Sequence, residues 1–308
     1  MILITGGTGF IGQSLIRQLI SHGYPVRTLI RPAQASPRLP KGVPIDAVVS
    51  SLLDERGVRA AMKGVDCVFH LVTGEFQGSQ SDLLKTDIQT TQVVTKAAEE
   101  TGVEHLVFIS HLGADRASAY PALKTKGICE NIIRTSPVPH TILRSGLVYG
   151  AGDHFTEGIK TILSIFRPFV ILPDHGETHF QPIWRDDLVS CLLWVLQTEE
   201  MKGKTLEVGG PEAITVREAI FAIRDQLGLK NMPIGMSSAY LRLLTVTLES
   251  MIKVFPFSTY WLDYFAADRT CAIDSVPKNF GIMPARFNQK INYLHLTKPS
   301  KPYARKRK

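Results

Sequence analysis

The first half of the chain alternates short apolar runs with longer amphipathic runs. The apolar runs, typical of buried strands, lie at residues 1–5, 25–30, 45–50, 66–72, 104–110 and 139–145. Runs with apolar residues three and four positions apart predict helices at residues 14–23, from Asp54 onward, at 81–101 and at 118–136. This order predicts a parallel sheet covered by helices on both faces, in a doubly wound α/β fold.

The pattern changes after Leu147, where loops rich in Pro, Gly and His begin. Two more helices are predicted at residues 186–197 and 217–228, the second with Thr215 as its N-cap. We therefore expect an α/β core at residues 1–147. We expect a smaller domain at residues 148–297, which is interleaved with the last elements of the core. A tail is expected at residues 298–308.

Composition places the chain among ordinary globular proteins. It has 308 residues, of which 44% are hydrophobic and 20% charged. No apolar run reaches the roughly 20 residues that span a bilayer, and no secretion signal is recognised. The four cysteines form no CxxC pair, which is typical of a reducing cytoplasm. The histidines lack metal-ligand spacing, so we expect no metal.

Charge is concentrated at the C-terminal end. The last eleven residues carry six of the basic side chains and no acid, leaving about +1 of the net charge of +7 for the rest. Such an arm binds anionic lipid, nucleic acid or an acidic partner, or is simply solvated. We expect no specific nucleic-acid binding.

A glycine motif follows the first predicted strand and opens the first predicted helix. Gly6, Gly9 and Gly12 have the spacing GxxGxxG in ILITGGTGFIG. In this context Gly6 permits a tight turn, Gly9 lets a pyrophosphate approach the backbone, and Gly12 permits close packing of helix on sheet. Phosphates are then bound at the helix N-terminus. Thr8, Phe10 and Ile11 complete the predicted phosphate-binding segment.

The end of the second strand indicates which dinucleotide is bound. An NAD-binding chain usually has an acidic residue there, whereas this chain has Arg31, with Arg27 nearby, in VRTLIRP. A guanidinium suits a 2′-phosphate, so NADP(H) is expected and NAD(H) is the alternative. Ser51, Leu52 and Leu71 are also predicted to contact the cofactor.

Several segments together resemble the short-chain dehydrogenase/reductase superfamily in its extended and atypical branches. They include GGTGFIG, HLVFISHLGA and HTILRSGLVYG, and later PIWRDD and GGPEAIT. The later segments are similar to a subgroup that contains the nucleotide-binding accessory subunit of respiratory complex I and its bacterial relatives. The resemblance covers residues 1–230. It implies a nicotinamide dinucleotide in a Rossmann domain and a substrate site in the smaller domain.

The resemblance also implies a proton relay of serine, tyrosine and lysine. Tyr120 and Lys124 have the four-residue spacing that puts a tyrosine and a lysine on one helix face. Ser110, or His111, ends the preceding strand. In such a relay tyrosine is the acid or base, and lysine lowers its pKa and holds the nicotinamide ribose.

A second register competes with the first. In related sequences the catalytic lysine precedes a glutamate by four residues, which here selects Lys126 and Glu130. The tyrosine position is then Ala122, and Tyr120 lies near the N-cap because Pro121 suits a first helical turn. In this register Lys126 still holds the ribose but no tyrosine relay exists.

Two more family positions differ. Ser51 replaces the aspartate that reads adenine, and Asp87 replaces an asparagine in the long helix. Both substitutions change the hydrogen bonds that the family pattern provides, but neither removes the backbone N–H groups that bind phosphate.

Three functions remain open. The first is an NADP(H)-dependent oxidoreductase acting on a carbonyl, an alcohol or a quinone-like compound. The second is a non-catalytic nucleotide-binding accessory or assembly factor of a membrane-associated redox complex. The third is an NAD-dependent nucleotide-sugar epimerase or dehydratase. The apolar stretch 239–265 forms either core or a surface for a membrane, a partner or a small apolar substrate. We expect a cytoplasmic protein, with the inner face of the membrane as a second location.

Overall fold

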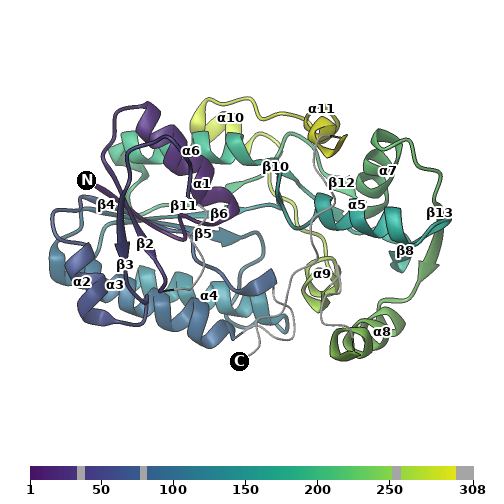
Figure 1. Ribbon diagram of the computed structural model, residues 1–308, viewed down its shortest axis with the longest axis horizontal. Helices are drawn as coiled ribbons and strands as arrows, with labels where there is room; N and C mark the ends of the chain where they lie inside the picture. Colours follow the sequence, from purple (N-terminus) through teal and green to yellow (C-terminus); the bar gives the residue numbers. More distant parts are fainter. Residues whose placement is uncertain (33–38, 77–81, 252–257, 296–308) are drawn as a thin grey trace. The chain divides into compact units, whose positions relative to one another are not determined.

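A seven-stranded parallel sheet organises the first of the two compact units into which the chain divides. The computed structural model describes residues 1–32, 39–76, 82–251 and 258–295 (Figure 1). The first unit is drawn from residues 1–74, 82–145 and 185–208, and the second from the remainder.

The strand order confirms the predicted Rossmann-type fold. The order is β3-β2-β1-β4-β5-β6-β11, and every neighbouring pair is parallel. Successive strands are added on one side of β1 up to β3 and then on its other side from β4 onward, so the strand order switches between β1 and β4. Doubly wound folds bind ligands at such a switch point, at the carboxyl ends of the strands. The strands are β1 (Ile2–Thr5), β2 (Val26–Ile30), β3 (Asp46–Val49), β4 (Cys67–His70), β5 (His105–His111), β6 (His140–Ser145) and β11 (Thr205–Val208).

Helices cover both faces of this sheet (Figure 1). One face carries α2 (Glu55–Ala61), α3 (Thr90–Thr101) and α4 (Pro121–Arg134), and the other carries α1 (Phe10–Ser21) and α6 (Arg185–Gln197). A π-helical turn, η2 (Leu84–Gln89), leads into α3, and a 3₁₀ turn, η4 (Glu199–Met201), precedes β11. Apolar side chains such as Leu3, Val68 and Phe108 pack with α2, α3 and α4 into one core.

The capping residues predicted from the sequence lie at the ends of helices in the structure. Asp54 caps α2 by accepting a hydrogen bond from the Arg56 N–H, and Gly102 ends α3 in the left-handed conformation. Thr215 and Glu218 form a capping box at the start of α7 (Val216–Gln226).

The second unit combines short strand pairs with helices. The pairs are β7 (Val148–Tyr149) with β10 (Ile183–Trp184), β9 (His179–Phe180) with β12 (Ile214–Thr215), and β8 (Phe169–Pro173) with β13 (Met232–Met236). Its further elements are α5 (Thr156–Ile165), α8 (Ser238–Met251), α9 (Thr259–Tyr264), α10 (Ser275–Phe280), α11 (Phe287–Lys290), η3 (Asp174–Gly176) and η5 (Ile291–His295). The basic tail lies outside the described residues.

The apolar stretch 239–265 combines both environments that its sequence allowed. Its part in α9 is buried, with Tyr260, Trp261 and Tyr264 in the core of the second unit. Its part in α8 exposes apolar side chains, including Tyr240 and Leu243. Across the described residues, no helix combines the length and hydrophobicity that crossing a bilayer would require.

Candidate functional site

The glycine motif forms a tight turn between β1 and α1. Gly6 has φ +81°, a conformation that side chains with a Cβ rarely adopt, and its carbonyl accepts a hydrogen bond from the Gly9 N–H at 2.9 Å. Gly9 is the N-cap of α1 and provides no side-chain cap. Phe10 and Ile11 follow in the first helical turn, whose N–H groups have no partner within the helix. This helix start therefore presents backbone donors to an anion.

Steric contacts explain the spacing of the motif. A Cβ on Gly12 would lie 2.4 Å from the Gly6 carbonyl oxygen and 2.8 Å from the Gly7 Cα. Gly7, whose role the sequence reasoning missed, is equally constrained, because a Cβ there would lie 2.3 Å from Thr28 Oγ1. The double glycine in GGTG was the available signal. Thr8 is exposed at the tip of the turn.

The turn lies where β1 and β4 end side by side. The Leu71 N–H donates to the Thr5 carbonyl at 3.1 Å. A Cβ on Gly6 would lie 3.0 Å from the Leu71 carbonyl carbon. The structure thus brings together Gly6 and Leu71, two residues predicted to contact the cofactor from segments far apart in sequence.

The two arginines of β2 and its end have different surroundings. Arg27 Nε donates to Asp46 Oδ2 at 2.6 Å, and its Nη1 donates to the carbonyls of Ala61 and Lys63. Arg31 directly follows the carboxyl end of β2 and is exposed. Arg27 therefore fixes β2 to its neighbours, and Arg31 is the guanidinium at the end of the strand where nucleotides bind.

The segment after β3 places Ser51 and Leu52 differently. Ser51 is exposed, its Oγ accepts from the Leu53 N–H at 3.2 Å, and its carbonyl accepts from the Asp54 N–H at 3.0 Å. The Leu52 side chain is buried in the core. Of these two residues, Ser51 therefore presents its side chain to solvent and Leu52 does not.

The start of α4 gives Tyr120 an N-cap position. Tyr120 has extended backbone angles, φ −90° and ψ 120°, and Pro121 is the first helical residue. The Tyr120 N–H donates to Ser118 Oγ at 3.1 Å, and the side chain is half-buried. Lys124, four residues on, is exposed. Lys124 therefore belongs to the exposed side of the helix, whereas Tyr120 precedes the helix as its N-cap.

Lys126 lies on the opposite, buried side of α4. Its Nζ lies 3.7 Å from Asp87 Oδ1 and 5.3 Å from the centroid of the Phe108 ring. Asp87 Oδ2 accepts a hydrogen bond from the Gly74 N–H at 2.9 Å. Two residues rotate a helix by about 200°, which separates Lys126 from Lys124. The half-buried Ala122 lies one turn before Lys126.

Contacts deeper in the unit hold α4 in this orientation. Glu130 is fully buried, and its carboxylate accepts hydrogen bonds from Arg144 on β6 at 2.7 and 2.9 Å and from Arg134 at 2.7 Å. Gly127 lets the loop before α4 cross the helix, because a Cβ there would lie 2.4 Å from the Arg116 nitrogen. Lys126, which directly precedes Gly127 and lies one turn before Glu130, therefore faces inward.

A polar network that the sequence reasoning missed connects this lysine with the glycine turn. His70 Nδ1 lies 2.7 Å from Thr5 Oγ1, and His70 Nε2 lies 3.0 Å from Thr91 Oγ1. Thr91 Oγ1 in turn donates to the Asp87 carbonyl at 2.7 Å. Burial, and then the charge of Lys126, lowers the pKa of His70 to about 3. His70 is therefore neutral and supplies one donor and one acceptor.

Ser110 lies at the carboxyl end of β5. Its side chain is fully buried, and within the described part of the chain its Oγ has no hydrogen-bond partner. Because a buried hydroxyl without a partner is costly, this atom is a candidate to bind a ligand oxygen. His111, the other candidate, is half-buried. Among the residues with described positions, no three His, Cys, Asp or Glu side chains are grouped as metal ligands.

Comparison with known proteins agrees with this geometry. A family model described as NAD(P)H-binding matches residues 6–159. The mitochondrial NADH dehydrogenase [ubiquinone] 1 alpha subcomplex subunit 9 of Arabidopsis thaliana is 26% identical over 73% of this chain, which spans 57% of that protein. The (4-alkanoyl-5-oxo-2,5-dihydrofuran-3-yl)methyl phosphate reductase of Streptomyces griseus is 29% identical over 74% of each chain.

A solved structure shows the same fold. The NADPH-dependent quinone oxidoreductase of Escherichia coli, complexed with NADPH, has a TM-score of 0.73 and 18% identity, and the alignment covers 96% of this chain and all of that one. The chain spans little more than half of the length of the plant subunit.

Proposed function

Since this chain belongs to the NAD(P)H-binding family, within the atypical short-chain dehydrogenase/reductase superfamily, we propose that it holds NADP(H) without a tyrosine proton relay. The observation that carries this proposal is the orientation of α4. The buried lysine is Lys126, and the residue one turn before it is Ala122. Lys124 lies on the exposed side of the helix, and Tyr120 precedes the helix as its half-buried N-cap.

The residues of the first unit fit the dinucleotide. The start of α1 has no side-chain cap, and the turn leaves no room for a Cβ at Gly12, so backbone N–H groups are accessible to phosphate. Arg31 would pair with a 2′-phosphate through its guanidinium. Ser51 would replace the acidic residue that reads adenine in relatives. When bound, the nicotinamide ring is a hydride donor or acceptor.

Lys126 and Ser110 are the side chains that we assign to the nicotinamide end. Lys126 would donate to the ribose hydroxyls, with its charge balanced by Asp87. Ser110 Oγ would donate to a polar atom of the bound molecule, which would satisfy this buried hydroxyl. Neither role moves a proton during a reaction, so both are compatible with a protein that only holds the nucleotide.

We assign this nucleotide-holding chain to a larger redox assembly near a membrane. The support is the likeness to a subunit of a plant NADH dehydrogenase, together with the missing relay. In such an assembly the bound dinucleotide stabilises the first unit, because a ligand that binds only the native state raises its stability.

A reductase is the second candidate function. The buried Ser110 hydroxyl at the end of β5 and the likeness to a Streptomyces reductase favour it. In that case the substrate is a carbonyl or quinone-like compound, and a group other than Tyr120 supplies the proton.

Calorimetric titration with NADPH tests the proposal. We expect Lys126→Met to weaken binding at least about tenfold, equal to ~1.4 kcal/mol, and the matched Lys124→Met and Tyr120→Phe to leave it unchanged. If wild type does not bind NADPH, or if Lys124→Met weakens binding as much as Lys126→Met, the proposal is wrong. Consumption of NADPH with a panel of aldehydes, ketones and quinones separates the two functions. If Tyr120→Phe abolished such turnover, this result would show that a tyrosine relay operates.

A further inference from the structure

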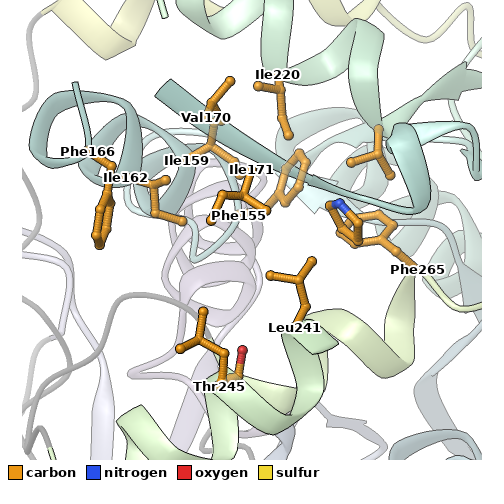
Figure 2. A pocket seen from close by; sticks show the side chains of 13 residues that line it. Phe155, Ile159, Ile162, Phe166, Val170, Ile171, Ile220, Leu241, Thr245 and Phe265 are labelled. Carbon is orange, nitrogen blue, oxygen red and sulfur yellow. The ribbon is translucent and has the colours of Figure 1, made fainter. Parts of the chain in front are cut away.

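An apolar cavity lies inside the second unit (Figure 2). It has a volume of about 120 Å³ and is walled by α5, β8, α7, α8 and Phe265. Side chains from α5, among them Ile159 and Ile162, lie across the space from Leu241 and Thr245 of α8 (Figure 2). Every residue that lines the cavity belongs to this one unit.

The walls select an apolar occupant. Thr245 is the one lining residue with a polar side chain, so a water molecule would not find the two to four partners that it needs. A dry, apolar cavity of roughly 150 Å³ is known to bind a benzene ring. A space of comparable size with these walls therefore suits a hydrocarbon segment.

The cavity has a mouth at the surface. Phe166, Ile171 and Leu244 line the cavity, yet 49%, 39% and 42% of their surfaces are exposed. These side chains connect the interior with solvent. A hydrocarbon chain can therefore enter here while its polar end stays outside.

The surface beside this mouth is also apolar. In the β8–β13 pair, Phe169 lies opposite Met232 and Ile171 lies opposite Ile234, and all four are exposed. Partners in register point to the same face of a sheet. Together with the mouth residues they form an apolar rim: Phe166, Phe169, Ile171, Met232, Ile234 and Leu244. Contiguous exposed patches of this kind mark interaction sites.

Positive charge borders the apolar rim. Arg167 and Lys230 lie two residues before the first residues of β8 and β13, at the same end of this parallel pair. Both are exposed, and neither has an ion-pair partner among the residues whose positions are described. Such cations are attracted to anionic lipid headgroups near the membrane surface.

We propose that the cavity takes a short segment of the hydrocarbon chain of a membrane lipid and that the apolar rim lies against the bilayer. The polar end of that lipid stays at the mouth, near Arg167 and Lys230. This inference does not depend on the dinucleotide, because every residue in it belongs to the second unit.

Lipid uptake from vesicles tests the proposal. The protein is incubated with vesicles of phosphatidylcholine and phosphatidylglycerol and is then re-isolated by gel filtration. The lipid that it retains is extracted and quantified by mass spectrometry. We expect about one lipid per wild-type chain and at least a fivefold loss in Leu244→Trp, whose larger ring blocks the mouth. Leu243→Trp is the matched control, because Leu243 is exposed on the same helix and does not line the cavity.

Two further arms identify the chain and its source. Palmitoleic acid and farnesol, each supplied below its solubility limit, distinguish an acyl from an isoprenyl chain. The double variant Arg167→Glu, Lys230→Glu should lose uptake from vesicles and keep uptake of the free chain. Thermal unfolding confirms that each variant is folded, and Leu244→Asp, which puts a charge at the mouth, is a second variant that should reduce entry of an apolar chain. Absence of lipid on wild type, or equal loss in the Leu244 and Leu243 variants, would overturn the proposal.

Discussion

Lys126 Nζ lies 3.7 Å from Asp87 Oδ1 inside the first unit, where the two side chains are only 6% and 2% exposed. Removing two charges from water costs several kcal/mol each, so each charge depends on the other and on nearby dipoles. The Gly74 N–H and the Phe108 ring supply further contacts. This pair couples α4 to η2 and determines which lysine of the helix faces the sheet.

Removing one charge of this pair should reduce the stability of the protein strongly, and removing both charges should reduce it less. We expect Lys126→Met and Asp87→Asn each to lower the free energy of unfolding by roughly 3–5 kcal/mol, because the remaining charge stays buried. The double variant should recover part of the loss. Urea denaturation of the four proteins measures this coupling, and strictly additive losses would show that the charges are independent. Lys124→Met, on the exposed side, should change stability by less than about 0.5 kcal/mol.

Gly12→Ala should remove dinucleotide binding and reduce stability. Its Cβ would lie 2.4 Å from the Gly6 carbonyl, so the turn and the helix start must separate. NADPH titration and thermal unfolding are the measurements. Gly203→Ala is the control. Gly203 has φ +81° with open space around it, so this substitution should cost only about 1 kcal/mol of stability through backbone strain. Normal NADPH affinity in Gly12→Ala would contradict the assignment of the turn.

Arg31→Ala should reduce the preference for NADPH over NADH. Loss of a charge-assisted pair with the 2′-phosphate is worth about 1.5–3 kcal/mol, or roughly ten- to a hundredfold in NADPH affinity. Affinity for NADH should hardly change, as measured by parallel titrations. Arg17→Ala, an exposed arginine of α1, serves as the control. An equal effect on both dinucleotides would assign Arg31 a general electrostatic role.

Stability should fall in weak acid because His70 is buried and neutral. Its pKa is lowered to about 3 in the folded chain, against about 6.5 when unfolded, so the unfolded state binds the proton first. The stability that comes from keeping His70 neutral is therefore present above pH 6.5 and is lost progressively as the pH falls toward 3. Urea denaturation at several pH values should show a shallower slope for His70→Gln. His105, with its pKa lowered to about 4 mainly by burial, retains part of the slope.

Much of the fold could be predicted from local pattern. The apolar runs became the strands of the parallel sheet, and the capping residues Asp54, Gly102 and Thr215 lie where helices begin or end. The glycine spacing predicted the turn between β1 and α1. Such features depend on backbone preferences within a few residues, which a sequence records directly.

The two registers of α4 could not be separated in this way. Tyr120 with Lys124, and Lys126 with Glu130, are both legitimate helical spacings. The choice depends on Asp87, which is 39 residues from Lys126, and on Arg144, which binds Glu130 from β6. In the same way, only the contact of Arg27 with Asp46 separates its role from that of Arg31.

By itself, then, the sequence determined the Rossmann-type sheet, the glycine turn and the dinucleotide-binding family, because steric and hydrophobic periodicity act over short stretches of chain. Only the tertiary structure decided which lysine is buried, which arginine stays at the strand end, and that α5, β8, α7 and α8 enclose an apolar cavity. These outcomes depend on which side chains from distant parts of the chain meet in the folded protein, and local spacing does not record those partners.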